Sequence, residues 1–308
     1  MKTDKILIIG AGAIGSFYGA LLAKAGADVS VVCRSDYNTV KKHGYKIHSE
    51  ELGSWTFKPS QVVSNASDYT DKADYILLCT KVIPELDRVK LIEKAVKDNT
   101  SIILIQNGIG IEQALVDAFP NNEVVSGLAF ICCNRLSPGN IHHLAYGKIT
   151  LGNLSHSSDK TQHLIDLFNK SGIEANTSDN IVTSRWLKCL WNAAFNPLSV
   201  LSSGLSTQKI LTTQEPLIRT IMQEVCNIAE SCGHSLPEDS IDINIRNTHA
   251  MPPYKTSMLL DYQKRQTMET EAILGNTIRI AKNKGISCPT LDTLYALLKL
   301  KEASKYTL

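Results

Sequence analysis

The sequence predicts an α/β protein in which an N-terminal, doubly wound sheet is followed by an all-α C-terminal domain. Between residues 5 and 105, short β-rich runs alternate with helical patterns. The runs ILLC and IILI are continuously apolar, which is typical of parallel strands that are covered on both faces by crossover helices. After Thr183, helical periodicity dominates. Together these observations predict two domains, residues 1–179 and 180–308, with the boundary near Asp179.

The elements of the first domain follow from local pattern. A helix from about Ala13 to Ala25 is closed by Gly26, because glycine readily adopts the conformation that ends a helix. Residues Gly44–Val63 have β-forming residues around an EELG turn and predict a hairpin insertion. Parallel strands are predicted at Lys5–Ile9, Asp28–Cys33, Tyr75–Cys79 and Ser101–Ile105.

The end of the sheet and the second domain are marked by turn residues. Glu123–Asn153 is β-rich with a Pro138-Gly139-Asn140 turn, so we expect antiparallel strands there. In the second domain, helices are expected to break at Gly204, Pro237, Met251-Pro252-Pro253 and Pro289.

Composition excludes several classes of function. The chain has 308 residues, 43% of them hydrophobic, enough for two cores, and its net charge of +2 shows no basic surplus for binding nucleic acid. We expect no membrane segment, because no apolar run approaches about eighteen residues and the N-terminal run is broken by glycines. The 8 cysteines lie scattered in apolar segments without spacing suited to zinc. We therefore expect reduced thiols, no metal and a cytoplasmic location.

A glycine pattern follows the first strand and opens a helix. In this context Gly10 permits a tight turn, Gly12 lets a pyrophosphate approach the backbone, and Gly15 allows close packing of helix on strand. The pattern predicts a dinucleotide site of the Rossmann type; the alternative is a glycine turn without a ligand. The motif comprises Gly10, Ala11, Gly12, Ala13, Ile14 and Gly15.

The second strand ends in VVCRSD, without an acidic residue directly at its end. Arg34 is placed where the adenosine ribose should lie, and its planar guanidinium suits a 2′-phosphate, with Ser35 as a neighbour. The sequence favours NADP over NAD. The alternative is a solvated Arg34 with Asp36 binding the ribose hydroxyls.

A polar stripe marks the helix RWLKCLWNAAFNPLSVL. Lys188, Asn192 and Asn196 are spaced by four residues and lie on nearly one face, among apolar neighbours. A buried lysine needs a carboxylate or a ligand, so the stripe indicates a site for neutralising the alkoxide that forms when a ketone is reduced. Alternatively, the asparagines brace the domain interface and Lys188 reaches water.

Two further stretches supply candidate partners. A helix bearing Glu269 offers a carboxylate to Lys188, although a lone glutamate is more often an exposed helical residue. Asn107 follows a buried strand, where ligands of open α/β sheets lie, and should border the nicotinamide; an Asn-Gly turn is the alternative.

Together these motifs resemble the ketopantoate reductase family over nearly the whole chain. The features that carry the resemblance are GAGAIG, the arginine of VVCR, LLCTK ending in Lys81, QNG at Asn107, K-x-x-x-N-x-x-x-N-P at Lys188–Pro197, SMLxD, and E-x-E-x-x-x-G at Glu269–Gly275. The resemblance implies NADPH-dependent reduction of ketopantoate to pantoate, on the route to pantothenate and coenzyme A. It implies roles for individual residues: Lys188 as general acid, Glu269 positioning it, Asn192 and Asn196 holding substrate oxygens, Ser257 binding the carboxylate, Asn107 bridging nicotinamide, lysine and substrate, and Lys81 near the cofactor.

Two positions depart from the family pattern. Pro84 and Leu260 stand where the family often has glutamine, so another branched or β-hydroxy 2-keto acid stays open as the substrate. A non-catalytic NADP sensor is the alternative from another class, although a sensor has no need of a converging lysine, two asparagines and a glutamate. A homodimer is compatible with the sequence, which does not fix the oligomeric state.

Overall fold

The chain folds into two units in the computed structural model, which describes residues 3–251 and 255–304. The first unit comprises residues 1–81, 85–106 and 112–181. The second comprises residues 182–308 together with two short segments, Val82–Pro84 and Asn107–Ile111. Each short segment follows the end of a sheet strand, so the chain leads from these strand ends directly into the second unit.

The first unit is built on a 10-stranded sheet in the order β4-β3-β9-β8-β7-β6-β1-β2-β5, with β10 paired to β9. The run from β8 to β5 is parallel, whereas β8 with β9 and β3 with β4 are antiparallel. The strands are β1 (Lys5–Ile9), β2 (Asp28–Val32), β3 (Tyr45–Ser49), β4 (Gly53–Phe57), β5 (Val62–Val63), β6 (Tyr75–Leu78), β7 (Ser101–Ile105), β8 (Val124–Ser137), β9 (Asn140–Asn153) and β10 (Ala175–Thr177).

The predicted hairpin insertion and the antiparallel end of the sheet are both present. The hairpin is shorter than expected, because it ends with β4. Val62 and Val63 leave it to form β5, which pairs in parallel with β2 at the opposite edge.

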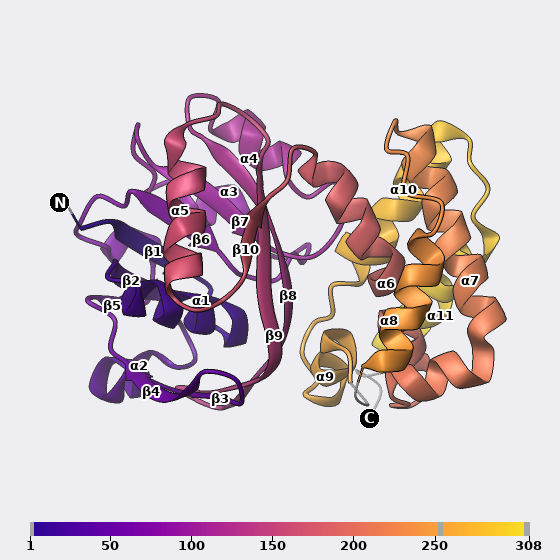
Figure 1. Cartoon of the computed structure of the whole chain (residues 1–308), viewed down its shortest axis with the longest axis horizontal. Helices are drawn as coiled ribbons and strands as arrows, with labels where there is room; N and C mark the ends of the chain where they lie inside the picture. Colours follow the sequence, from indigo (N-terminus) through magenta and orange to yellow (C-terminus); the bar gives the residue numbers. More distant parts are fainter. Residues whose placement is uncertain (1–2, 252–254, 305–308) are drawn as a thin grey trace. The chain divides into compact units, whose positions relative to one another are not determined.

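Both faces of the parallel strands are buried, which explains their continuous apolar runs. In β1, Ile6 and Ile8 belong to one core, whereas Leu7 and Ile9 belong to the other. Helices α1 (Ala13–Lys24) and α5 (Asp159–Lys170) cover the first face, and the short helices α3 (Arg88–Ile92) and α4 (Gln113–Ala118) cover the second (Figure 1). The doubly wound sheet predicted from the sequence is confirmed.

The second unit is helical, as predicted. Its core is formed around α6, where Leu190, Ala193 and Phe195 are fully buried. A kink interrupts α7 at Gln214, two residues before Pro216, because proline cannot donate to the preceding turn. The elements are α6 (Ile181–Leu201), α7 (Thr207–Ser231), α8 (Ser240–Ala250), α9 (Ser257–Gln263), the π-helical turn η2 (Glu271–Gly275), α10 (Asn276–Lys284) and α11 (Pro289–Ala303).

The predicted helix breaks fall between or at the ends of these helices. Gly204 separates α6 from α7, Pro237 separates α7 from α8, and Pro289 begins α11. Met251 ends α8, whereas Pro252 and Pro253 lie outside the described residues.

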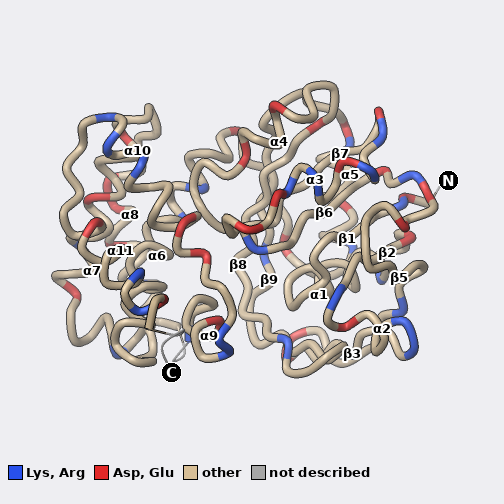
Figure 2. The backbone as a smooth tube through the Cα atoms, turned by 180° about the vertical axis from the view of Figure 1, so that it is seen from behind, with Lys and Arg blue, Asp and Glu red and all other residues tan. Residues whose placement is uncertain are grey.

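Charged residues of both signs are interspersed along the backbone, as Figure 2 shows. In the described ranges, no helix is long and apolar enough to cross a membrane. A remaining helix of the first unit, α2 (Tyr37–His43), follows β2 and leads into the hairpin.

Candidate active site

The glycine turn between β1 and α1 contains glycines that are required for different reasons. A Cβ on Gly10 would lie 2.7 Å from Thr80 N, and one on Gly15 would lie 2.5 Å from Gly10 O, so the fold itself excludes side chains at both positions. A Cβ on Gly12 would meet no atom within 4 Å. Gly12 therefore leaves open space beside the first turn of α1, where unpaired N–H groups favour an anion such as a pyrophosphate.

The residues after β2 are those expected to contact the adenosine ribose of a bound dinucleotide, and they differ in exposure. Arg34 and Ser35 are exposed, whereas Asp36 is only 1% exposed. The Asp36 carboxylate accepts hydrogen bonds from Ser35 Oγ (2.7 Å) and Gly139 N (3.0 Å) and forms an ion pair with Arg135. Because this carboxylate is buried and already bonded to three groups, it is poorly placed to bind ribose hydroxyls.

Arg135 was not identified from the sequence. Its Nη1 donates to Ser35 Oγ at 2.7 Å, so a second guanidinium, 30% exposed, lies beside the loop that carries Arg34. Arg135 lies close to the end of β2 because of the path that the β8–β9 hairpin takes. Local sequence pattern does not reveal a contact of this kind.

The ends of β6 and β7 are tied together by a residue that the sequence analysis also missed. Gln106 Nε2 donates to Thr80 O (2.6 Å) and to Thr80 Oγ1 (3.0 Å). Lys81, which is half-buried, follows Thr80, and Asn107 follows Gln106. The bond therefore fixes the chain immediately before Lys81 and immediately before Asn107.

Within the second unit, three predicted residues form one hydrogen-bonded chain. Lys188 Nζ on α6 donates to Asn107 Oδ1 at 2.9 Å, and Asn107 Nδ2 donates to Glu269 Oε2 at 3.3 Å. The other carboxylate oxygen, Glu269 Oε1, accepts a hydrogen bond from Val82 N at 3.0 Å. The amide of Asn107 thus connects an amine to a carboxylate with both of its polar atoms in use.

Among these three hydrogen-bonded residues, it is the pKa of Lys188 that the surroundings shift most clearly. Burial lowers the pKa of the Lys188 amine, the nearby Arg185 guanidinium lowers it further, and the Glu269 carboxylate raises it, with a net value of about 8. An amine with this pKa is mostly protonated at neutral pH yet gives up its proton far more readily than an ordinary lysine.

The segment that carries Asn107 is held against the second unit by backbone contacts. Gly108 has a φ of +113°, and a Cβ there would lie 2.7 Å from Ala272 O. Ile109 N donates to Ala272 O at 3.0 Å, Asn276 Nδ2 donates to Ile109 O at 2.7 Å, and Arg185 Nη1 donates to Gly108 O at 3.1 Å. Arg185 therefore both positions this segment and lowers the pKa of Lys188. Its spacing of three residues from Lys188 on one helix is the signal that could have identified it.

The three residues predicted to bind substrate, Asn192, Asn196 and Ser257, differ in burial and in their surroundings. A pocket is lined by Asn107, Gly108, Arg185, Lys188, Cys189, Asn192 and Ile273. Asn192 thus joins Lys188 in one lining. Asn196 is only 1% exposed, and its Oδ1 has no hydrogen-bond partner within residues 3–251 and 255–304. Ser257 is the exposed first residue of α9.

The structure corrects the expectation that Glu269 lies on a helix. It precedes the helical residues and the π-helical turn η2. Glu271, by contrast, accepts hydrogen bonds from Tyr295 Oη (2.6 Å) and Arg279 Nη1 (2.9 Å) and has Lys299 Nζ at 3.4 Å. Only the first glutamate of the E-x-E motif contacts Asn107, whereas the second serves the packing of the C-terminal helices.

Comparison with known proteins defines the class. The model "Ketopantoate reductase PanE/ApbA" matches residues 6–156, and "Ketopantoate reductase PanE/ApbA C terminal" matches residues 180–302. A 2-dehydropantoate 2-reductase from Nostoc is 33% identical over 100% of this chain and 98% of its own length. These matches and the fold define a two-unit oxidoreductase.

Solved structures agree with that class. The crystal structure of 2-dehydropantoate 2-reductase from Methylococcus capsulatus has a TM-score of 0.92 and 52% identity, covering 98% of both chains. A ternary structure of D-mandelate dehydrogenase with NADH and anilino(oxo)acetate has a TM-score of 0.88 and 26% identity, covering 97% of this chain and 99% of the other. The chain belongs to the ketopantoate reductase family.

Proposed function

We propose that this protein reduces ketopantoate to pantoate with NADPH, and that Lys188 is the proton donor. The single observation that carries the proposal is the hydrogen-bonded chain from Lys188 through Asn107 to Glu269, with the pKa of the amine lowered to about 8. Ketone reduction needs a group that neutralises the developing alkoxide, and a poised ammonium serves this purpose.

The proposed reaction uses residues of both units, each with its own role. The glycine turn, with open space at Gly12, would hold the pyrophosphate of a nicotinamide dinucleotide, and Arg34, Lys81 and Asn107 would contact the cofactor. The bound cofactor supplies the hydride. Lys188 donates its proton to the ketone oxygen as the hydride adds to the carbonyl carbon, and Glu269 holds Asn107, which in turn orients the amine.

Chain connectivity supports the roles of Asn107, Lys188 and Glu269. Ligands of open α/β sheets lie beyond the carboxyl ends of the strands. The chain leaves β6 and β7 at those ends and continues into Val82–Pro84 and Asn107–Ile111, the segments that contact Glu269 and Lys188.

The preference for NADPH rests on the loop after β2. Arg34 is exposed there, Arg135 lies beside Ser35, and Asp36 is buried in its own ion pair. Two guanidinium groups without an accessible carboxylate favour a 2′-phosphate over ribose hydroxyls.

The substrate assignment follows the names of the relatives, and the remaining residues would bind that substrate. Asn192 shares the pocket lining with Lys188, and Asn196 has a buried oxygen without a partner in the described part of the chain. We propose that both bind substrate oxygens, with Asn196 Oδ1 accepting a hydrogen bond from a substrate hydroxyl, and that Ser257 binds the carboxylate. A different 2-keto acid is the second candidate, favoured by the likeness to a D-mandelate dehydrogenase and by Pro84 and Leu260.

The decisive experiment is a steady-state assay with NADPH and NADH against a panel of 2-keto acids. We expect the highest kcat/KM with NADPH and ketopantoate. Best turnover with a pyruvate-like or aryl-substituted acid would contradict the ketopantoate assignment and leave the reductase intact.

The role of Lys188 is tested separately. Lys188→Ala should lower kcat by at least ~10² while leaving NADPH affinity nearly unchanged, because the amine acts on the ketone oxygen. Lys209→Ala, at an exposed position on α7, is the matched control and should have wild-type kinetics. If the protein were a non-catalytic sensor, the wild type would turn over no keto acid. If Lys188→Ala had a normal kcat, this lysine would be excluded as the acid.

A further inference from the structure

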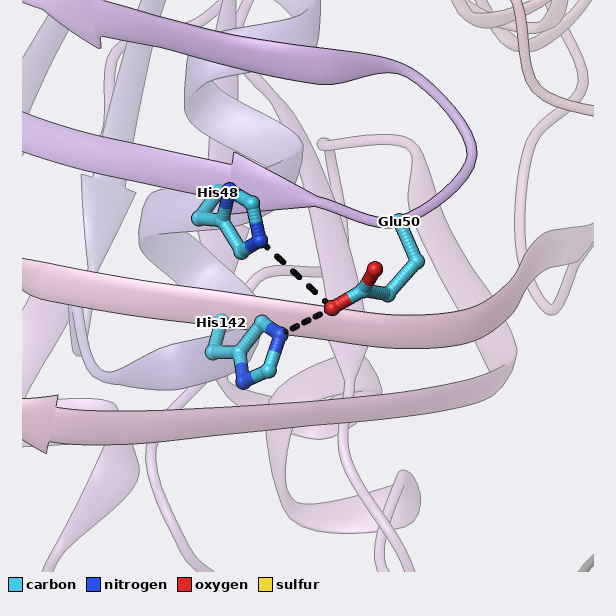
Figure 3. Close-up of side chains that lie close together, drawn as sticks. All are labelled: His48, Glu50 and His142. Carbon is cyan, nitrogen blue, oxygen red and sulfur yellow. Dashed lines mark hydrogen bonds and ion pairs between the residues drawn. The ribbon is translucent and has the colours of Figure 1, made fainter.

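A cluster of two histidines and a glutamate lies on the first unit, on the strands β3 and β9. His48 and His142 are directly paired in the parallel register of β3 and β9, so their side chains leave the sheet on the same face. Glu50 follows the end of β3. Figure 3 shows both imidazoles directed at the same carboxylate, with His142 Nε2 at 2.7 Å and His48 Nε2 at 3.5 Å from Glu50 Oε1.

The cluster is oriented by neighbouring groups. His48 Nδ1 lies 2.6 Å from Ser54 Oγ on β4, which leaves Nε2 as the ring nitrogen directed at Glu50. Glu50 N donates to His143 O at 3.0 Å, which fixes the start of the turn that carries the carboxylate. Ordering of a histidine through its second ring nitrogen is a common feature of metal sites.

Contrary to the absence of a metal expected from the sequence, we propose that His48, Glu50 and His142 bind a divalent transition ion, and that Zn²⁺ is the ion they fit. Imidazole and carboxylate are ligands that zinc accepts, with bonds of roughly 2.0–2.2 Å that separate tetrahedral ligand atoms by ~3.3 Å. One ligand atom from each of the three residues lies within 4.8 Å of the others. To admit the ion, the His142–Glu50 contact would widen from 2.7 Å and any ligand atoms farther apart than ~3.3 Å would move closer, and water would complete the coordination.

The alternative is a surface ion pair between Glu50 and one or both histidines. Glu50 has a side chain 52% exposed and His48 one 58% exposed, so such pairs would contribute little to stability. An ion pair also requires only one histidine, whereas two imidazoles from paired strands converge here on one oxygen. A bound ion would link the tip of the β3–β4 hairpin to β9 and stabilise the native state by mass action.

The test is titration of the metal-free full-length protein with Zn²⁺ by calorimetry, with thermal melts in parallel. We expect one equivalent to bind and the melting temperature to rise, whereas Mg²⁺, which prefers oxygen ligands, should have no effect. His48→Asn and His142→Asn should each weaken this binding by at least ~10-fold, and Ser54→Ala should weaken it by roughly 10-fold through loss of orientation.

Controls separate this site from other zinc-binding groups. His163→Asn removes a half-exposed histidine that pairs with Asp4 on the same unit and should leave zinc affinity unchanged. Co²⁺ substitution identifies the ligands, because a sulfur-to-metal charge-transfer band would assign the ion to one of the 8 cysteines. That band, the absence of binding at micromolar zinc, or equal affinity in the His142→Asn variant would each overturn the proposal.

Discussion

At the scale of single residues, Lys188, the proposed general acid, has a pKa that is set by opposing neighbours. Burial and Arg185 lower its pKa, and Glu269 raises it. Without the carboxylate, the amine would lose its proton nearer to neutrality; without burial, it would hold the proton too firmly to donate it. Arg185 contributes through its charge and also fixes the backbone of Gly108 beside Asn107.

This balance predicts a pH dependence. In the proposed reduction Lys188 must be protonated, so kcat/KM should be level well below pH 8, reach about half its maximum near pH 8 and fall above it, following a pKa of about 8. Glu269→Gln removes the charge that raises this pKa, so the falling limb should move to lower pH. A pH–rate profile of both proteins with ketopantoate measures the shift. If the limb of Glu269→Gln stayed in place or moved to higher pH, the coupling between the two groups would be refuted.

A second prediction concerns cofactor choice. Arg34→Ala removes an exposed guanidinium after β2 and should raise the KM for NADPH by about 10- to 100-fold, the range expected for loss of a charge-assisted hydrogen bond. The KM for NADH should change little, because NADH lacks the 2′-phosphate. Arg246→Ala, on helix α8 of the second unit, is an exposed arginine for comparison. If Arg34→Ala raised the KM for NADPH and the KM for NADH by the same factor, Arg34 would not bind the 2′-phosphate.

At the scale of elements, local pattern predicted the central parallel strands and the helix breaks of the second unit, but it misplaced β5 and did not predict β10. β1 and β7 occupy the predicted residues, since each is a continuous apolar run bounded by polar residues. Helix α1 ends one residue early, before Gly26, whose φ is +108°. Glu269 was wrongly assigned to a helix, because the acidic, apolar pattern continues unchanged across the start of a π-helical turn.

Contacts between elements that are distant in sequence could not be predicted in the same way. Arg135 reaches Ser35 only because the β8–β9 hairpin passes the end of β2, and His142 meets His48 only through the register of β9 with β3. The Lys188, Asn107 and Glu269 chain was predicted by combining chemistry with family resemblance, and periodicity alone would have given the lysine face but not its partners.

The glycine turn supports a prediction at this scale. Gly12→Ala adds a Cβ to open space at an ordinary φ of −76°, so the melting temperature should hardly change while NADPH binding weakens. Gly15→Ala places a Cβ 2.5 Å from Gly10 O and should lower the free energy of unfolding by ~1–3 kcal/mol. Thermal melts and NADPH titrations distinguish the two effects. Loss of stability in Gly12→Ala without loss of binding would show that the glycine serves the fold alone.

At the scale of the whole molecule, the sequence of the first unit is interrupted twice by short segments that belong to the second unit. Val82–Pro84 and Asn107–Ile111 lie in the second unit although each is flanked by residues of the first. Ile109 is 3% exposed in the core of the helical unit, two residues after Asn107. The position of Asn107 therefore depends on the chain that leaves β7 and on the contact of Ile109 within the helical core. The homodimer and the cytoplasmic location stay predictions.

Interleaving predicts that the two units unfold together. Ile109→Ala removes a buried side chain from the helical core, and Ile76→Ala removes one from the core beneath α3 and α4, each at a cost of about 2–5 kcal/mol. The chain enters and leaves the helical unit twice, at Val82–Pro84 and at Asn107–Ile111, before it enters for the last time at Val182. Unfolding of the helical unit would therefore free two segments that are joined at both ends to the first unit. In scanning calorimetry, both variants should lower the midpoint of one shared transition. Two separate transitions, each moved by only one substitution, would show that the units are thermodynamically independent and that Asn107 is positioned by the helical unit alone.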